Sequence, residues 1–560
     1  MAQRMEMIEA DKLPGLAGRL VRGYQWLARR ELLACAVILF FTLGLRAALL
    51  PWLPVPRPVI HDEFSYLLAA DTYAHGRLTN PPHPFWQHFE TFHVLQQPTY
   101  ASKYQPLQGL VLALGQKLFR EPWMGVYLST GLMCAAICWM LQGWIAPEWA
   151  MLGALLCVLR VGVLSYWMNS YNAGALPAIG GALVFGAVAR ILWKRQFRHS
   201  ITWALGLSVL VLSRPFDAAV VACATTAILL WALSKSNTPF RTICMRVAFP
   251  ALVILVVCAA GVAYNDYRVT GHAMRLPYQV NEQQYAMVSA FAMVPLGPQP
   301  VYRHEALRQY WVDFQVGVWK RDRAHPLLVR LVNFYVLDNF FFPFWALLIP
   351  VFLFPYDLNT TEERATVFLL LVFVLMISVL IAVQPHYAAA FAGVFYLRLL
   401  QSLRRLWSWR PAGKAVGRAL GILLIGLLLG ELCNNLFGLI HNGEAAFTAT
   451  RGRDVITQSF TQLGSHFESA RRPIMQVLEK QPGRQLVLVR YAPQHDFLFE
   501  EWVYNRANID ASTIVWAREM GPEQDRPFVE YFRDRQIWLL EPDLSPPKLS
   551  PYPRTELRQP

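Results

Sequence analysis

The sequence predicts an all-α polytopic membrane domain, with interfacial helices in its first external loop, followed by a small C-terminal α/β domain. Three observations predict this class. Of the 560 residues, 55% are hydrophobic and only 16% are charged, whereas a soluble protein has about 25% charged residues. Apolar runs near the length that crosses a bilayer recur from residue 32 to residue 440. Beyond them the pattern changes to short segments of alternating type.

The N-terminal segment, residues 1–31, is polar and basic, and we expect it to be cytoplasmic. The apolar run after it is too long for the apolar part of a cleavable signal peptide. It therefore predicts a signal anchor that stays in the membrane. The formal charge of +14 does not indicate a nucleic-acid partner, since much of the excess lies in short clusters beside apolar runs.

The transmembrane domain, residues 32–440, contains eleven candidate spans, of which two are short. A span needs about 20 apolar residues. The candidates are 32–51, 123–141, 148–166, 173–193, 200–213, 216–234, 247–264, 338–356, 365–383, 386–401 and 419–440. Segment 106–119 is also apolar, and its 14 residues leave open whether it spans, is re-entrant or lies at the interface.

Basic clusters predict the orientation, because short cytoplasmic loops carry an excess of Lys and Arg. With the N-terminus inside and 106–119 not spanning, the clusters between later spans fall on the cytoplasmic side. They are Arg190, Lys194, Arg195 and Arg198; Lys235, Arg241 and Arg246; and Arg404, Arg405, Arg410, Lys414 and Arg418. Counting 106–119 as a span would move the next three clusters outside. The sequence therefore favours a cytoplasmic N-terminus and an external C-terminus.

Three long segments then lie outside, at 52–105, 265–337 and 441–560. The last of these predicts the C-terminal domain. Its expected strands are Leu486–Tyr491, Thr513–Ala517 and Ile537–Leu540, with an amphipathic helix at Gln524–Arg535 and an irregular end at Pro542–Pro560. None of the eight cysteines falls in these external segments, so we expect no disulfides there.

The first external loop has two parts. The spacing of residues 62–75 puts Asp62, Tyr66 and Tyr73 near one face, which predicts a helix along the membrane interface. The stretch 81–92, rich in Pro and aromatic residues, is typical of an irregular segment that lies against the membrane.

Four short polar motifs fall on the external face under this topology. They are His61-Asp62-Glu63, Asn169-Ser170-Tyr171-Asn172, Ser213-Arg214-Pro215-Phe216-Asp217 and Gln384-Pro385-His386-Tyr387. Their convergence predicts one site there, and Arg160, just inside the outer end of its span, is expected to face the same site. Carboxylates beside lipid are costly unless they bind something, which makes Asp62 the best candidate for a catalytic residue, with Glu63 beside it.

The chemistry that suits this position is group transfer from a lipid-linked phosphate. Asp62 would be the base that takes a proton from an acceptor hydroxyl, while Lys103 and Arg214 would hold the phosphate. The candidate binding residues are Lys103, Tyr104, Arg214, Asn169, Tyr171, Asn172, His386 and Tyr387.

Each of these residues also has a purely structural interpretation. An Asp-Glu pair favours the first turn of a helix, and Arg214 before Pro215 is compatible with a helix break and an arginine that reaches the interface. Lys103 is compatible with a headgroup anchor, and His386 with a buried, hydrogen-bonded histidine.

Histidines in the first external loop offer a metal-site alternative. The loop holds five of them, His61, His75, His83, His88 and His93, near Asp62, Glu63 and Glu90. Such groups bind zinc, but their spacing matches no closed metal motif. We therefore expect no dedicated metal ligands, and whether a divalent metal ion assists the reaction stays open.

Taken together, the motifs resemble those of polyprenyl-phosphate-dependent glycosyltransferases of the GT-C fold, in the family-39-like group related to protein O-mannosyltransferases and the lipid A aminoarabinose transferase. The resemblance covers most of the chain, and its first stretch is the most specific. It is carried by residues 61–94, 100–116, 166–187, 213–218 and 500–522. It implies a GT-C type membrane domain in the bacterial inner membrane, as part of the cell envelope.

By this resemblance Asp62 is the catalytic base candidate and Lys103 contacts the donor phosphate. The sequence departs from the family where Tyr104-Gln105-Pro106 stands in place of a double proline, and where Ala218 stands in place of a glycine. The family implies a polyprenyl-phosphate donor such as an undecaprenyl- or dolichyl-phosphate sugar, either hexose or pentose. It also implies inversion at the anomeric carbon and an external acceptor, which is a protein, a lipid or a glycan.

Two other classes stay open from the sequence. A lipid or glycan transporter or flippase would need polar groups at mid-membrane between broken helices, and Glu431 is the only such residue in the last span. A scaffold of the same fold would need no chemistry at Asp62.

Overall fold

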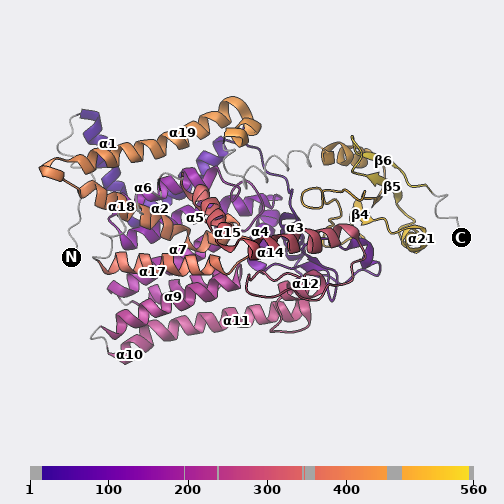
Figure 1. Ribbon diagram of the computed structural model, residues 1–560, viewed down its shortest axis with the longest axis horizontal. Helices are drawn as coiled ribbons and strands as arrows, with labels where there is room; N and C mark the ends of the chain where they lie inside the picture. The colour runs from indigo at the N-terminus through magenta and orange to yellow at the C-terminus, as the bar shows by residue number, and fades with distance from the viewer. Residues whose placement is uncertain are drawn as a thin grey trace.

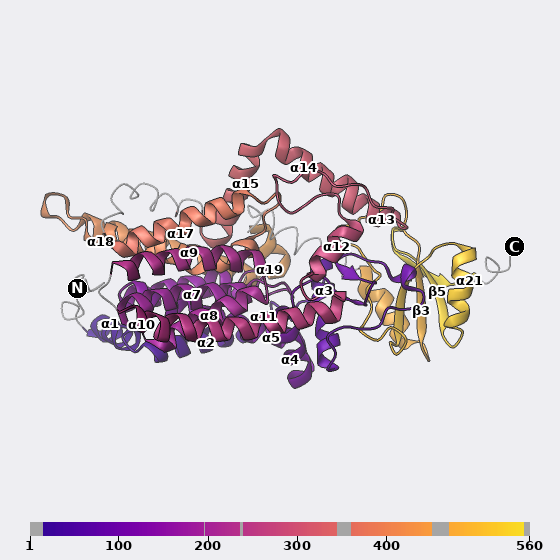
Figure 2. The ribbon, with the colours of Figure 1, turned by 90° about the horizontal axis from the view of Figure 1, so that it is seen from below.

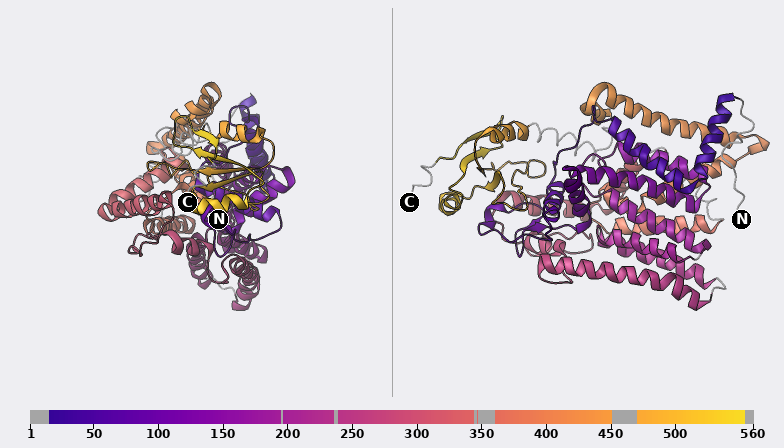
Figure 3. Two further views of the ribbon diagram at one scale, coloured as in Figure 1. Left: turned by 90° about the vertical axis from the view of Figure 1, so that its right-hand side faces the viewer. Right: turned by 180° about the vertical axis from the view of Figure 1, so that it is seen from behind.

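The computed structural model describes residues 15–194, 196–235, 239–343, 346, 360–450 and 470–553. Near-parallel helices form an elongated bundle, and a small β-sheet domain lies beyond one end of it (Figure 1). We call this the sheet end of the bundle. The opposite end carries α1 (Gly15–Ala28) and α10 (Phe240–Ile243), as the view from behind also shows (Figure 3).

Long apolar helices make up the bundle. The remaining members are α2 (Glu31–Ala48), α5 (Trp123–Trp144), α6 (Pro147–Cys157) with the π-helix η3 (Val158–Val163), α7 (Ala175–Lys194), α8 (Phe197–Val211), α9 (Pro215–Ser234), the π-helix η4 (Cys244–Ala248), α11 (Phe249–Thr270), α15 (Pro326–Phe341), α17 (Thr361–Ser378), α18 (Ala392–Ser408) and α19 (Val416–Thr450). Six helical segments in the described part of the chain are long and apolar enough to cross a membrane. The protein is therefore a multi-pass membrane protein.

The expected spans coincide with helices wherever the structure describes them. Two boundaries differ most from the expected ones. Most of the expected span 338–356 lies outside the described residues, but α15 already begins at Pro326, inside the expected external segment 265–337. A proline at the first position of a helix favours this start. The charge of Arg330 made this stretch look unlike a membrane helix in the sequence. In the structure, Arg330 forms an ion pair with Asp322. The second difference is α19, which runs to Thr450, past the expected end at 440.

Ion pairs join the helix ends far from the sheet. Arg29 pairs with Glu148 at 3.0 Å, Arg190 pairs with Glu31, and Arg405 lies 3.6 Å from Glu363. Every residue of these pairs falls on the cytoplasmic side in the topology expected from the basic clusters. The helix directions therefore agree with the orientation expected from the basic clusters.

Short helices gather at the sheet end. They are α3 (His61–Ala74), η2 (Trp86–Phe89), α4 (Pro106–Phe119), α12 (Pro277–Tyr285), α13 (Glu305–Arg308), the π-helix η5 (Gln309–Phe314) and α14 (Gln315–Ala324), with a hairpin of β1 (Val94–Leu95) and β2 (Ala101–Ser102). Figure 2 shows α14 and α15 rising from the bundle as an arm.

Helix α4 resolves the question that segment 106–119 left open. Its 14 residues reach about 21 Å at about 1.5 Å per residue, less than the apolar thickness of a bilayer. It packs along α3 instead. A Cβ atom at Gly109 would lie 2.6 Å from the Cβ of Ala69, so this glycine allows the two helices to approach. Segment 106–119 is therefore a short helix beside α3.

The C-terminal domain is a four-stranded sheet in the order β4-β3-β5-β6. Its strands are β3 (Gln485–Val489), β4 (Ile514–Arg518), β5 (Gln536–Glu541) and β6 (Lys548–Pro551), and α21 (Pro522–Tyr531) connects β4 to β5. Strand β3 is parallel to both of its neighbours, whereas β6 is antiparallel to β5. The three expected strands and the helix are confirmed. Strand β6 corrects the irregular end expected after Pro542.

The stretch 81–92 was expected against the membrane, and this was wrong. It packs on the C-terminal domain. His88 Nε2 lies 3.1 Å from Asp525 Oδ1 with both side chains buried, and the ring of Phe89 lies 5.6 Å from that of Phe528. Aromatic side chains suit either a lipid interface or a protein core, and composition alone does not separate the two.

Candidate active site

Asp62 lies in the first turn of α3, at the sheet end of the bundle. At the start of the helix, the side chain of Glu63 accepts a hydrogen bond from the amide of the N-cap residue Ile60, which is one half of a capping box. The hydroxyl of Tyr104 donates to Asp62 Oδ1. The ring of Tyr104 also stacks on that of Tyr66, one turn along α3, at 4.5 Å. Asp62 is partly exposed and thus has room for a further partner.

Lys103 lies beside Asp62 with only 4% of its surface exposed. Its ammonium faces three aromatic rings, with Nζ 5.3 Å from the centre of Tyr104, 4.9 Å from Tyr278 and 5.7 Å from Trp311. Burial lowers the pKa of Lys103 to about 8, while the carboxylates of Asp62 and Glu282 oppose that shift. The result is a cation that is poorly solvated by water and is available to an anion.

A second cation, Arg214, reaches the same region from the turn between α8 and α9. Its Nε lies 2.7 Å from Asp217 Oδ2, and its guanidinium lies 4.2 Å from the ring centre of Tyr387. Tyr387 comes from the 3-10 helix η8 (Pro385–Phe391). Burial raises the pKa of Tyr66, the charge of Asp62 adds to that rise, and the charge of Arg214 opposes it. Tyr66 is thus within electrostatic range of both charges.

His386 precedes Tyr387 in η8 and contacts Tyr166. Its backbone amide donates to the hydroxyl of Tyr166 at 3.1 Å, and its Nδ1 lies 2.8 Å from the same oxygen. The histidine therefore holds the start of η8 against the segment that follows η3. Three of the four expected polar motifs meet around Asp62, Lys103 and Arg214.

The fourth motif, 169–172, does not join this cluster. Asn169 accepts a hydrogen bond from Arg46 and donates to Val163 and Ser165 carbonyls. The hydroxyl of Tyr171 donates to the carbonyl of Pro56. Asn172 is buried, and its amide donates to the Ser170 hydroxyl. These three residues were expected to bind substrate, but their hydrogen bonds are internal and hold the start of the first external loop.

Glu63 belongs with that internal network. Its carboxylate is 3% exposed and accepts hydrogen bonds from the amides of Val59 and Tyr171, both at 2.8 Å, as well as from Ile60. Burial raises its pKa to about 7, although these three hydrogen bonds oppose the rise. The two adjacent carboxylates thus differ: Asp62 is open to the site, and Glu63 fixes the backbone.

Sequence reasoning missed the residues that the second external segment contributes. Tyr278 and Glu282 come from α12, and Tyr310 and Trp311 from η5. Burial raises the pKa of Tyr278, to which the charge of Glu282 adds. The aromatic content of this segment was visible in the sequence, but its register relative to Lys103 depends on tertiary packing.

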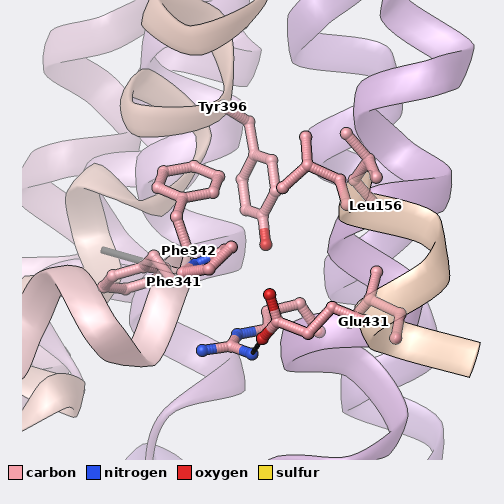
Figure 4. A pocket seen from close by; sticks show the side chains of 9 residues that line it. Leu156, Phe341, Phe342, Tyr396 and Glu431 are labelled. Carbon is pink, nitrogen blue, oxygen red and sulfur yellow. Dashed lines mark hydrogen bonds and ion pairs between the residues drawn. The ribbon is translucent and has the colours of Figure 1, made fainter. Parts of the chain in front are cut away.

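Arg160 was expected to face the site, and this was wrong. Its Nη1 lies 3.0 Å from Glu431 Oε1, and its remaining donors reach the carbonyls of Asn339 and Phe340 at the end of α15. Figure 4 shows this ion pair at the edge of a pocket with Phe341, Phe342 and Tyr396. Glu431 is therefore paired rather than alone in the last span.

The histidines of the first external loop form separate contacts. His61 Nδ1 lies 3.0 Å from the Tyr504 hydroxyl, and His83 and His88 lie 3.2 and 3.1 Å from Asp510 and Asp525. Among the described residues, no three His, Cys, Asp or Glu side chains come close enough to hold a metal ion. The crowding of histidines reflects the contact with the C-terminal domain.

The site thus combines a carboxylate that is open to a proton donor with two cations. Lys103 is shielded from bulk water, whereas Arg214 is partly exposed and pairs with Asp217. Such a pair of cations binds a phosphate and stabilises negative charge on its oxygens. Tyr66, Tyr104, Tyr278 and Tyr387 supply flat apolar faces and hydroxyl groups, which suit a sugar. All of these side chains lie at one end of the membrane helices, where a lipid carries its headgroup.

No model of a known protein family and no curated protein matches this sequence. Among solved structures, the chain is similar to ArnT from Cupriavidus metallidurans bound to undecaprenyl phosphate, at 12% identity and a TM-score of 0.47, over 94% of this chain and 93% of that one. It is also similar to the oligosaccharyltransferase AglB from Archaeoglobus fulgidus in complex with an inhibitory peptide and a dolichol-phosphate, at 11% identity and a TM-score of 0.48, over 92% and 70%.

The apo oligosaccharyltransferase from Archaeoglobus fulgidus matches over 82% of this chain, at 13% identity and a TM-score of 0.45, and the match spans 62% of that protein. The ArnT structure holds undecaprenyl phosphate, and the AglB complex holds a dolichol-phosphate. Identities of 11–13% carry no information on donor or acceptor, so the functional assignment depends on the residues of the site.

Proposed function

We propose that this protein is a membrane glycosyltransferase that moves a sugar from a polyprenyl-phosphate donor to an acceptor hydroxyl outside the cytoplasm. The observation that carries the proposal is the meeting of Asp62 with two cations, the buried Lys103 and the partly exposed Arg214, at the sheet end of the helices. A lipid phosphate would reach these cations from the bilayer without leaving it.

Each group has a place in the reaction. Lys103 and Arg214 bind the donor phosphate, and Asp62 takes the proton of the acceptor hydroxyl as the acceptor oxygen bonds to the anomeric carbon. The bond from that carbon to the phosphate oxygen breaks, and polyprenyl phosphate leaves with the electron pair. A single displacement of this kind inverts the anomeric configuration. Removal of one cation is expected to cost roughly two to four kcal/mol at the barrier.

The surrounding parts follow from this assignment. Residues 32–440 form the glycosyltransferase domain of a plasma-membrane protein, with 1–31 in the cytoplasm and 441–560 outside. Glu63 supports Asp62 by accepting hydrogen bonds from backbone amides, and it does not bind substrate. The sugar, a hexose or a pentose, and the acceptor, whether protein, lipid or glycan, are matters for experiment.

Lipid analysis of a strain that lacks the protein tests the proposal. We expect a polyprenyl-phosphate sugar to accumulate, to disappear when the wild-type chain is restored, and to persist with Asp62→Asn. Asp534→Asn is the control, because Asp534 is an exposed carboxylate of the C-terminal domain that pairs with Arg484. An unchanged lipid profile in the deletion strain would contradict the proposal.

A further inference from the structure

The C-terminal domain packs against one side of α3, the helix that carries Asp62. A single hydrophobic cluster contains Leu68, Phe89, Val94 and Tyr100 of the first external loop together with Leu486, Leu488, Tyr504, Val515 and Phe528 of the C-terminal domain. Helix α3 therefore has the membrane bundle on one side and the sheet domain on the other. Neither half alone encloses it.

Tyr504 makes the closest contact with the first turn of α3. Its hydroxyl lies 3.0 Å from His61 Nδ1, and its ring stacks on Phe64 with centres 4.3 Å apart and planes within 2°. Positions i and i+3 of a helix lie on the same face, so Tyr504 contacts His61 and Phe64 on one face of the turn that carries Asp62. The side chain of Asp62 points instead to Tyr104.

The position of Tyr504 is itself fixed. Asn505 donates to the Trp516 carbonyl at 2.7 Å and accepts from the Trp516 amide at 2.9 Å, which joins the segment to β4. Farther along, the amide of Ala507 donates to Asp71 at 2.9 Å. The segment 504–507 thus contacts α3 at both its first turn and its third.

Other buried contacts prevent the domain from shifting. Arg518 donates to the Glu90 carbonyl at 2.7 Å, and His88 meets Asp525 at 3.1 Å. The Arg471 guanidinium lies 5.2 Å from the ring centre of Phe64 on α3. A rigid domain that contacts α3 on the face away from substrate is suited to fix the direction of a side chain on the opposite face.

We infer that Tyr504 is a positioning residue for the Asp62 carboxylate, acting through His61 and Phe64, and that the C-terminal domain is thereby part of the catalytic site. The inference rests on the proposed function for its effect on turnover. Its structural part, the ordering of the first turn of α3, is independent of any activity.

The experiment compares Tyr504→Phe, which loses the hydroxyl but keeps the stacked ring, with Tyr504→Ala and with wild type. We expect Tyr504→Phe to lower kcat about five- to tenfold with the KM for the donor and the Tm unchanged. Backbone amides of residues 61–66 should exchange hydrogen faster, while those of β3 stay protected. Tyr531→Phe is the matched control, since Tyr531 lies in the same domain and donates to Asp510 rather than to α3.

Unchanged kcat in Tyr504→Phe would overturn the inference, as would unchanged exchange over residues 61–66 in both variants. A loss of kcat that vanishes at a lower temperature, together with a lowered Tm, would also overturn it, because that result indicates stability alone. If wild-type protein transfers no sugar, the proposed function fails, and hydrogen exchange in Tyr504→Phe still decides the positioning role.

Discussion

At the scale of residues, the two adjacent carboxylates are separated by their hydrogen bonds. The Asp62 carboxylate accepts a hydrogen bond from the Tyr104 hydroxyl, and it faces Lys103. Glu63 has its oxygens occupied by three backbone amides. The sequence identified Asp62 and Glu63 as a pair, and the geometry assigns them different roles. A proton acceptor must have a free oxygen, which Glu63 lacks.

Substitution of Glu63 is expected to affect stability first. The side-chain NH₂ of glutamine would face an amide donor, so Glu63→Gln should lose about 1–3 kcal/mol of folding free energy. Thermal unfolding in detergent measures this. Asp62→Asn is the control and should keep its Tm. Equal Tm values for the two variants would show that Glu63 does not hold the backbone.

Lys103 predicts a pH dependence of donor binding. Burial places its pKa at about 8, and only the protonated form attracts phosphate, so binding should weaken as the pH rises through this value. We expect kcat/KM for the donor to fall about tenfold per pH unit above about pH 8.

Lys103→Arg is the control for this profile, because arginine stays protonated throughout the range. It should remove the alkaline fall, whatever its effect on the maximal rate. The same alkaline fall in Lys103→Arg would assign the titration to another group.

At the scale of elements, helix α3 was foreseen but its neighbours were not. Helical spacing gave residues 62–75 correctly, because the pattern of a helix is local. Three strands and the helix of the C-terminal domain were foreseen for the same reason, whereas β6 was not. The contact between that domain and residues 81–92 was not, since it joins His88 to Asp525, residues that are far apart in sequence. The sequence did not reveal that α12 contributes to the site, because those contacts also join residues that are far apart in sequence.

Arg518 is expected to form the most sensitive ion pair within the C-terminal domain. It pairs with Glu501 at 2.5 Å, with side chains 3% and 1% exposed. Arg518→Met leaves Glu501 charged, buried and without its cation, which should cost about 3–5 kcal/mol. Arg533→Met, from the exposed pair with Glu530, should cost less than about 1 kcal/mol.

Thermal unfolding of both variants measures the difference. A double variant, Arg518→Met with Glu501→Leu, should recover part of the loss because it removes the buried charge. No recovery in the double variant would mean that the hydrogen bond from Arg518 to the Glu90 carbonyl dominates.

At the scale of the whole molecule, charge parity and helix direction give the same arrangement. Basic residues and their ion pairs lie at the end of the bundle far from the sheet, and the proposed site lies at the sheet end (Figure 1). The basic residues of the loops predict this orientation of the helices, because the charge of a loop is a local property of the sequence. The span count of eleven stays a prediction, since the expected span 338–356 falls mostly outside the described residues.

Labelling of introduced cysteines tests the orientation. Ala412→Cys, in the turn between α18 and α19, should react with an impermeant maleimide only after the membrane is opened. Glu479→Cys, on the exposed surface of the C-terminal domain, should react in intact spheroplasts. Labelling of both sites in sealed membranes, or the reverse pattern, would exclude the proposed topology.

The central claim is that Asp62 is the base of a sugar transfer from polyprenyl phosphate. The most direct measurement is the rate at which purified protein releases polyprenyl phosphate from a labelled polyprenyl-phosphate sugar in the presence of acceptor. We predict that Asp62→Asn lowers this rate about 10²- to 10⁴-fold while its Tm stays that of wild type. Wild-type turnover in folded Asp62→Asn would contradict the account.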